Sequence, residues 1–296
     1  MDTKRKMRTA DFEVHETALL SLGLCTALAL LTASGFFSAV LFEVLGATIL
    51  YASLLFVFRE RKSKVQQRVL FLASYAFVVW FYCAVARITP ALGTKLRDGS
   101  LLAIDEAIFG QTPAVFCERV ATAWLTDLMS LCYLTYHFYL VLAVAQAAWI
   151  AGVSTQRLSA SLFMGFAIGF AGYLLVPAVG PIHAHPELFR ASLPGGTLSR
   201  VIAQLVTKGS SGFDVFPSLH VLITCILLHH DWRHLRRRFW IMAVPSLGLW
   251  VSTLYLRYHY GIDLLAAFLV FLTLRQTFAA ITKVGDGKTA ALSTQH

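Results

Sequence analysis

Two short segments, far apart in the chain, carry the side chains that could do chemistry. The segment GFDVFPSLHV places Ser218 and His220 at the start of a strongly apolar run. The segment YLRYHYGID places His259 and Asp263 four residues apart, which puts both on one face of a helix, about one turn apart. A carboxylate in that position can accept the Nδ1 proton of the imidazole. The Nε2 atom is then free to act as a nucleophile or base.

The first segment also predicts an anion site. Pro217 suits the first turn of a helix. The N–H groups that follow it, with the Ser218 hydroxyl, would bind an anion at a helix N-terminus. Two histidines, one carboxylate, a helix N-terminus and nearby arginines suit phosphoryl transfer. One histidine then attacks phosphorus in line while the other protonates the departing oxygen.

The elements that must position these residues are expected to be membrane-spanning helices. Of the 296 residues, 57% are hydrophobic and only 14% are charged, whereas soluble domains carry about 25% charge. Every span must be a helix because hydrocarbon cannot satisfy an open backbone. We predict an all-α, multi-pass bundle of about eight spans, namely 16–36, 37–58, 69–89, 124–148, 159–179, 215–230, 239–257 and 262–280.

The basic residues predict the orientation of these spans. About two thirds of the 25 Lys and Arg fall on one side if both termini are cytoplasmic, as the positive-inside rule requires. The net charge of +9 is therefore assigned to cytoplasmic loops, and no nucleic-acid partner is expected. His220 and His259 are separated by two crossings, so both are expected at the outer face, on the periplasmic, extracellular or lumenal side.

Two long outer segments are expected to contain short helices. The apolar spacing in DGSLLAIDEAIFG, within residues 90–123, suggests an amphipathic helix on the outer surface. A second short helix is predicted near residues 197–207, in an outer loop rich in Pro and Gly.

The segment P-S-L-H, followed two predicted spans later by S-T-L-Y-L-R-Y-H-Y-G-I-D, resembles the motifs of the type-2 phosphatidic acid phosphatase superfamily. Those motifs read P-S-x-H and S-R-x5-H-x3-D. The variant S-T-x-Y-L looks closest to the inositol phosphorylceramide synthase branch, as do DGSLLAIDEAIFG and YLLVPAVGP. The resemblance implies a six-helix catalytic domain at residues 69–280. Residues 1–68 would then be a tail and an added hairpin, and residues 281–296 a cytoplasmic tail.

The resemblance also implies a role for each site residue. His259 would form a phosphohistidine and Asp263 would orient it. His220 would act first as the general acid and then as the base that activates the acceptor, and Ser218 would contact the phosphate. No metal or other cofactor is implied, and the sequence shows no cluster of carboxylates to hold one.

The chain departs from the family at its phosphate-binding cations. Thr253 stands where the third motif has arginine, and the first motif, K-x6-R-P, is absent near Gly180. Other cations are therefore expected to bind the phosphate. The candidates are Arg257, Arg87, Lys208 and Arg190, and His183 in the outer loop is a further candidate for the substrate headgroup.

These features together predict an integral membrane enzyme that cleaves or transfers a lipid-linked phosphate at the outer interface. Its partners would be a lipid phosphate or phospholipid substrate, membrane lipids and, for a transferase, an alcohol acceptor. Inositol-phosphate-type headgroup transfer and phosphate hydrolysis both fit the sequence. The alternative from another class is a transporter or channel that uses His220, His259 and Asp263 as a proton or ion site.

Overall fold

The computed structural model describes residues 13–60, 63–149 and 153–293, and over these residues the chain is helical with no strand. The all-α prediction is confirmed. Each predicted span corresponds to one long helix, and the last helix continues past its predicted end at residue 280. The long helices are α1 (Val14–Ser34), α2 (Ala39–Val57), α3 (Lys64–Ala91), α6 (Ala123–Trp149), α7 (Val153–Leu175), α10 (Leu219–His234), α11 (Arg236–Tyr255) and α12 (Gly261–Ser293).

Among the described residues, five helices are long and apolar enough to cross a membrane, namely α1, α2, α3, α6 and α7. Helix α10, with 16 residues, is shorter than the roughly 20 residues that a span needs. It is surrounded by α6, α7, α11 and α12, and its residues from Leu219 to Leu227 are all buried. Helix α10 is therefore the central helix of the bundle, and these residues face protein.

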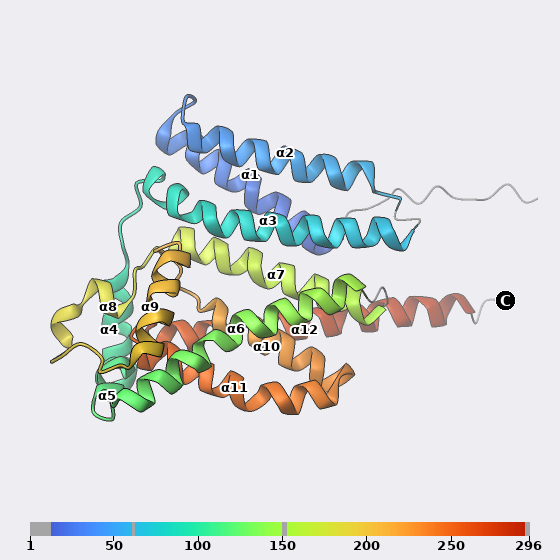
Figure 1. Cartoon of the computed structure of the whole chain (residues 1–296). Coiled ribbons are helices and arrows are strands. Elements are labelled where there is room, and N and C mark those ends of the chain that lie inside the picture. Colours follow the sequence, from blue (N-terminus) through green and yellow to red (C-terminus); the bar gives the residue numbers. More distant parts are fainter. Residues whose placement is uncertain (1–12, 61–62, 150–152, 294–296) are drawn as a thin grey trace, which may run out of the picture.

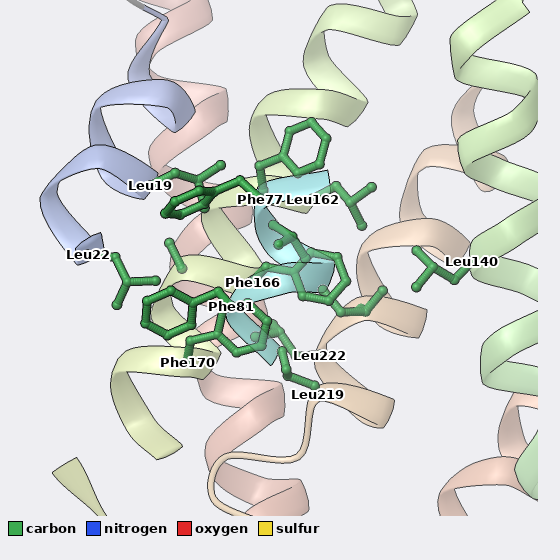
Figure 2. Close-up of a cluster of buried hydrophobic side chains, with 14 of the residues drawn as sticks. Leu19, Leu22, Phe77, Phe81, Leu140, Leu162, Phe166, Phe170, Leu219 and Leu222 are labelled. Atoms are coloured by element: carbon green, nitrogen blue, oxygen red, sulfur yellow. The ribbon is translucent and has the colours of Figure 1, made fainter. Parts of the chain in front are cut away.

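One continuous core joins the predicted N-terminal hairpin to the rest of the bundle. Side chains from α1, α3, α6, α7 and α10 meet in it (Figure 2). Phe81 of α3 stacks on Phe170 of α7 with ring centroids 5.3 Å apart. Between apolar helices in lipid, close packing rather than hydrophobic burial drives association, and small residues permit it. Gly165 of α7 illustrates this, because a Cβ there would lie 2.7 Å from Ile226 of α10.

The short helices gather at one end of the bundle (Figure 1). They are α4 (Asp98–Phe109), α5 (Pro113–Glu118), α8 (Pro181–Ala184), the 3₁₀ turn η1 (Pro186–Leu188) and α9 (Thr197–Gly209). Helices α4 and α9 confirm the two predicted surface helices. Asp127 of α6 accepts hydrogen bonds from the backbone N–H groups of Gly196 and Ser199 at 3.1 and 2.9 Å, which caps the start of α9.

The other end of the bundle carries the basic segments that were predicted to share one side. Arg68, at the start of α3, donates a hydrogen bond to the carbonyl of Trp149 at the end of α6. Arg238, just after the α10–α11 turn, pairs with the buried Asp231. The described residues of the segments 59–68 and 231–240 therefore lie at the same end of the bundle, opposite the short helices (Figure 1).

Candidate active site

The end of α11 forms the loop that presents His259. The carbonyl of Thr253 accepts hydrogen bonds from the N–H groups of Tyr258 and His259, at 3.0 and 3.2 Å. Arg257 turns the chain with a φ of 65°, in the left-handed region that residues other than glycine seldom adopt. The loop then leads directly into α12, whose first turn contains Asp263.

His259 links Asp263 to His220 in one chain of contacts. Its Nδ1 lies 3.3 Å from Asp263 Oδ2, and its Nε2 lies 3.3 Å from His220 Nδ1. His259 is only 2% exposed and Asp263 is fully buried. The backbone N–H of Tyr260 also donates to Asp263 Oδ2, at 2.7 Å, which fixes the carboxylate beside the imidazole. The two distant sequence segments thus meet at one end of the bundle, as the two crossings between them predicted.

His220 lies in the first turn of α10, with Ser218 as the residue that caps the helix. Its ring lies between Tyr133 and Tyr136 of α6, with both centroid distances 4.7 Å. The Ser218 hydroxyl is buried and has no hydrogen-bond partner among the described residues. An unpaired hydroxyl at a helix N-terminus, one turn from the paired histidines, suits a phosphate oxygen.

Helix α4 crosses the end of the bundle. Its two buried carboxylates, Asp98 and Asp105, hold the loop between α7 and α8 and the start of α12. Asp105 accepts from the N–H groups of Gly261 and Ile262, both at 2.8 Å, and from the hydroxyl of Thr112. It therefore satisfies two of the free N–H groups at the start of α12, directly beside the His259–Asp263 pair.

Asp98 holds the loop between α7 and α8, which contains Val179 and Gly180, in the same way. It accepts from the N–H groups of Val179 and Gly180 and from the Tyr260 hydroxyl at 3.0 Å. Burial, together with the negative charge of Asp98, raises the pKa of the Tyr260 phenol, so the hydroxyl stays protonated and donates. Asp98 and Asp105 are seven residues apart, two turns of α4, and both point inward.

A cavity of about 410 Å³ opens beside the histidine pair. His220, His259 and His183 line it, as do Leu205, Val206, Thr207 and Gly209 of α9. Its volume is in the range of small-molecule sites, and its wall is largely aromatic and apolar. The histidines are thus accessible from a pocket while they are shielded from bulk solvent.

The predicted phosphate-binding residues Arg257 and Arg87 contact other protein groups and do not line the cavity. Arg257 donates to the carbonyl of Ala191 and to Glu118, and its guanidinium lies 4.0 Å from the Phe189 ring centroid. Burial lowers the pKa of this guanidinium and Glu118 opposes the shift, so the group remains charged at neutral pH. Arg87 pairs with Glu43 of α2.

Lys208 and Arg190 are exposed residues of the outer end. Of all the predicted substrate-binding side chains outside the two motifs, His183 alone lines the cavity among the described residues. It is exposed on α8 and therefore lies at the rim.

The two departures from the family motifs have local structural explanations. Thr253 is fully buried, and its hydroxyl donates to the carbonyl of Trp250 in its own helix. Gly180 has a φ of 85°, and a Cβ there would lie 2.4 Å from the Tyr258 carbonyl oxygen. The loop that contains Gly180 therefore packs tightly against the His259 loop, where a larger residue does not fit.

Over the described residues, the chain is a bundle of long helices with a buried Asp–His–His chain and a pocket at one end. The profile of the PAP2 superfamily matches residues 99–275, more than half of the chain, and the chain belongs to this superfamily. Its members are generally phosphatases and phosphotransferases, so the chain is an enzyme that acts on phosphate-containing substrates. No curated protein and no solved structure matches the chain.

No motif in the sequence indicates the roles of Asp98, Asp105 and the tyrosines around His220. The spacing of the two aspartates was the available signal, because residues seven apart share a face of a helix. Acidic residues on the inward face of a surface helix need partners. Tyr260 and Gly261, which bind Asp98 and Asp105, however, lie more than 150 residues away in the chain.

Proposed function

We propose that this enzyme cleaves or transfers a lipid-linked phosphate through a covalent intermediate on His259. The observation that carries the proposal is the chain Asp263–His259–His220, with both contacts at 3.3 Å, beside a cavity at one end of a membrane bundle. The match to the PAP2 superfamily supports the same chemistry.

The contacts assign a proton to each position. The ionised Asp263 carboxylate can only accept a hydrogen bond. His259 therefore carries its proton on Nδ1, and its Nε2 atom carries a lone pair. That lone pair faces His220 Nδ1, which therefore donates. Asp263 thus holds His259 in the tautomer that attacks, and His220 holds the proton that the leaving group needs.

The proposed reaction has two displacements. In the first, His259 Nε2 bonds to phosphorus, the bond from phosphorus to the leaving oxygen breaks, and His220, as the imidazolium, gives a proton to that oxygen and becomes neutral. In the second, His220 takes a proton from water or an alcohol, whose oxygen attacks phosphorus and releases His259. His259 Nε2 now contacts His220 Nδ1, and phosphorus must bind at that Nε2. The two imidazole rings must therefore move apart to admit the phosphate.

The phosphate oxygens are proposed to bind at the start of α10 and at the cavity rim. The buried Ser218 hydroxyl, which has no partner among the described residues, and the N–H groups of the first helical turn are the proposed ligands. His183 at the rim is the proposed additional contact. Ser218 itself is fully buried and, like Arg257, Arg87 and Lys208, does not line the cavity in the described part of the chain, so the phosphate would reach any of these side chains only after a local movement.

The acceptor decides between hydrolysis and transfer. Water gives a phosphatase, and a ceramide-type alcohol gives a headgroup transferase like that of the inositol phosphorylceramide synthase branch. The resemblance to that branch in residues 252–256 supports transfer. The broader superfamily supports hydrolysis of phosphatidate or polyprenyl phosphates.

The test is turnover by the purified full chain with a panel of lipid phosphates, with and without an alcohol acceptor, and with products identified by mass spectrometry. We expect phosphate release or headgroup exchange, and its loss in His259→Gln. His229→Gln is the matched control, because it removes a histidine from α10 away from the cavity, where the ring contacts Phe271. Ion or proton flux without phosphate chemistry would instead identify a transporter.

The site is proposed to face away from the cytoplasm, because the basic segments lie at the opposite end of the bundle. Lys208 of α9 and Arg237 of α11 are both exposed, one at each end. In a variant without native cysteines, a membrane-impermeant thiol reagent on intact cells should label Lys208→Cys and leave Arg237→Cys unlabelled. The reverse pattern would place the site on the cytoplasmic side.

A further inference from the structure

The cavity beside the histidines has a distinctive charge pattern. Of the described residues that line it, Asp214 is the only acidic one, and none is lysine or arginine. The wall is also rich in aromatic rings, including Phe166 and Phe170 of α7, which also belong to the core cluster shown in Figure 2. The tyrosines that line it are Tyr75, Tyr82, Tyr133, Tyr136, Tyr173 and Tyr258.

Asp214 is a half-buried carboxylate whose partners are neutral. Its Oδ2 accepts from the Tyr82 hydroxyl at 2.5 Å, and its Oδ1 accepts from the Ser210 hydroxyl at 2.8 Å. No cation pairs with it in the described part of the chain. Each oxygen retains a lone pair, so the carboxylate can still accept from a ligand in the cavity.

The comparison with other carboxylates shows how Asp214 differs. Asp231 pairs with Arg238, Glu118 with Arg257, and Glu43 with Arg87. The carboxylates of α4 instead accept several backbone N–H groups, and they do not line the cavity. Asp214 has neither a cationic partner nor backbone N–H donors in the described part of the chain, although it faces a cavity with low-dielectric walls.

An ionised carboxylate beside a low-dielectric cavity costs free energy unless an opposite charge lies next to it. Aromatic faces attract cations, and aromatic rings combined with a carboxylate recognise ammonium groups. The Tyr82 ring belongs to the residue that is hydrogen-bonded to Asp214, and Phe170 lies 6.4 Å from that ring between centroids. The missing cation is therefore expected to come from the ligand.

We propose that this cavity binds the ammonium group of the substrate headgroup against Asp214, so that the preferred substrate is a zwitterionic phosphodiester lipid. The proposal rests on the proposed function, since the phosphate of the same headgroup occupies the histidine end. A primary and a quaternary ammonium share this chemistry, and the two are separate arms of the test.

The charges balance only for such a substrate. A phosphodiester brings one negative charge to the histidines and one positive charge to Asp214. A phosphomonoester brings nearly two negative charges and no cation, and it leaves Asp214 unpaired. In the first displacement the bond from phosphorus to the lipid alcohol breaks, the alcohol takes the His220 proton, and the ammonium headgroup remains on phosphorus at His259.

The resemblance to the inositol branch does not conflict with this choice. It is carried by residues 252–256, 98–110 and 173–181, and of these residues Tyr173 and Val179 line the cavity, neither of which carries a charge. Headgroup selection is made by the lining residues. A neutral polyol headgroup would hydrogen-bond to Asp214 without neutralising it.

The test compares turnover of phosphatidylethanolamine, phosphatidylcholine, phosphatidylinositol and phosphatidate by the purified full chain. At least one ammonium lipid should exceed the inositol lipid and phosphatidate by about tenfold or more in kcat/KM. Asp214→Asn should reduce that ratio about tenfold, mainly through KM. Glu187→Gln, which removes an exposed negative charge from the same end of the bundle, should leave it unchanged.

Preference for the inositol lipid or for phosphatidate, or an unchanged ratio in Asp214→Asn, would overturn the ammonium site and leave phosphoryl transfer intact. Absence of any turnover would count against the proposed function. Binding then still tests the cavity, because phosphocholine or phosphoethanolamine should raise the melting temperature of the wild type more than inositol phosphate does. The difference should disappear in Asp214→Asn, and equal stabilisation by all three would overturn the inference.

Discussion

Replacing Asp105 with Asn tests whether helix α4 sets the geometry of the active site. The carboxylate accepts three hydrogen bonds, from Gly261 N, Ile262 N and the Thr112 hydroxyl, at 2.7 to 2.8 Å. An amide of the same shape has only one acceptor oxygen. Its NH₂ group must therefore face at least one donor, and the start of α12 loses a partner.

The magnitude follows from the number and type of these bonds. A hydrogen bond to a charged group contributes about 1.5–3 kcal/mol, and an unsatisfied buried donor costs about 1–3 kcal/mol. Loss of one bond, with one N–H left unpaired, is thus worth about 2.5–6 kcal/mol locally. Relaxation of α12 to relieve this would move Asp263 relative to His259. A displacement of about 1 Å at reacting groups lowers rates by about 100-fold.

We therefore expect Asp105→Asn to lower kcat by about 10- to 100-fold and to change KM by less than about threefold. The assay is steady-state turnover of the best lipid substrate by purified protein, with thermal unfolding to confirm the fold. Glu106→Gln is the matched control, because Glu106 is the exposed neighbour on the same helix. It should behave like the wild type.

A kcat within twofold of the wild type for Asp105→Asn would refute this reasoning. If the variant does not fold, Thr112→Val is the milder test, since it removes the hydroxyl donor and keeps both N–H bonds of α12. It should lower kcat by a few-fold. Wild-type kcat in that variant would refute the claim in the same way.

Three other substitutions separate the roles of the site residues. Asp263→Asn should lower kcat by about 100- to 1,000-fold, because it disturbs only the tautomer and orientation of His259. His259→Gln should lower kcat further, and equal losses in the two variants in an end-point assay would contradict this. Gly180→Ala should destabilise the fold by about 1–3 kcal/mol, since Gly180 has a positive φ against the Tyr258 carbonyl; an unchanged unfolding midpoint would count against it. Arg257→Ala should lower turnover at least about fivefold by releasing the loop that Glu118 holds, whereas Arg87→Ala should stay within twofold; the opposite order in parallel assays would contradict this role of Arg257.

The parts of the fold that follow from hydropathy and chain crossing could be predicted. His220 and His259 were expected at one face because two apolar runs separate them, and their ring nitrogens lie 3.3 Å apart. Pro217 was expected in the first turn of this helix, but α10 begins at Leu219 and Pro217 precedes its N-cap residue, Ser218. Helix α10 itself was the weakest span because the central helix of a bundle faces protein and does not need the length or apolarity of a lipid-facing one.

The parts that depend on contacts between distant segments could not be predicted. Arg257, two residues before His259, was a candidate phosphate ligand by proximity in sequence. The structure pairs it with Glu118, 139 residues earlier in the chain, because the left-handed turn at Arg257 places its side chain against α5. Asp98 reaches Tyr260 across 162 residues. No local pattern encodes such pairs, since tertiary packing alone creates them.

The most direct test of the account is to trap the phosphorylated enzyme. Purified protein is mixed with substrate labelled in the phosphate, quenched in alkali or acid, and digested for mass spectrometry. The account predicts a phosphoryl adduct on His259 that is stable in alkali and lost in acid, present in the wild type and absent in His259→Gln. An adduct on another residue, or normal turnover by His259→Gln, would contradict it.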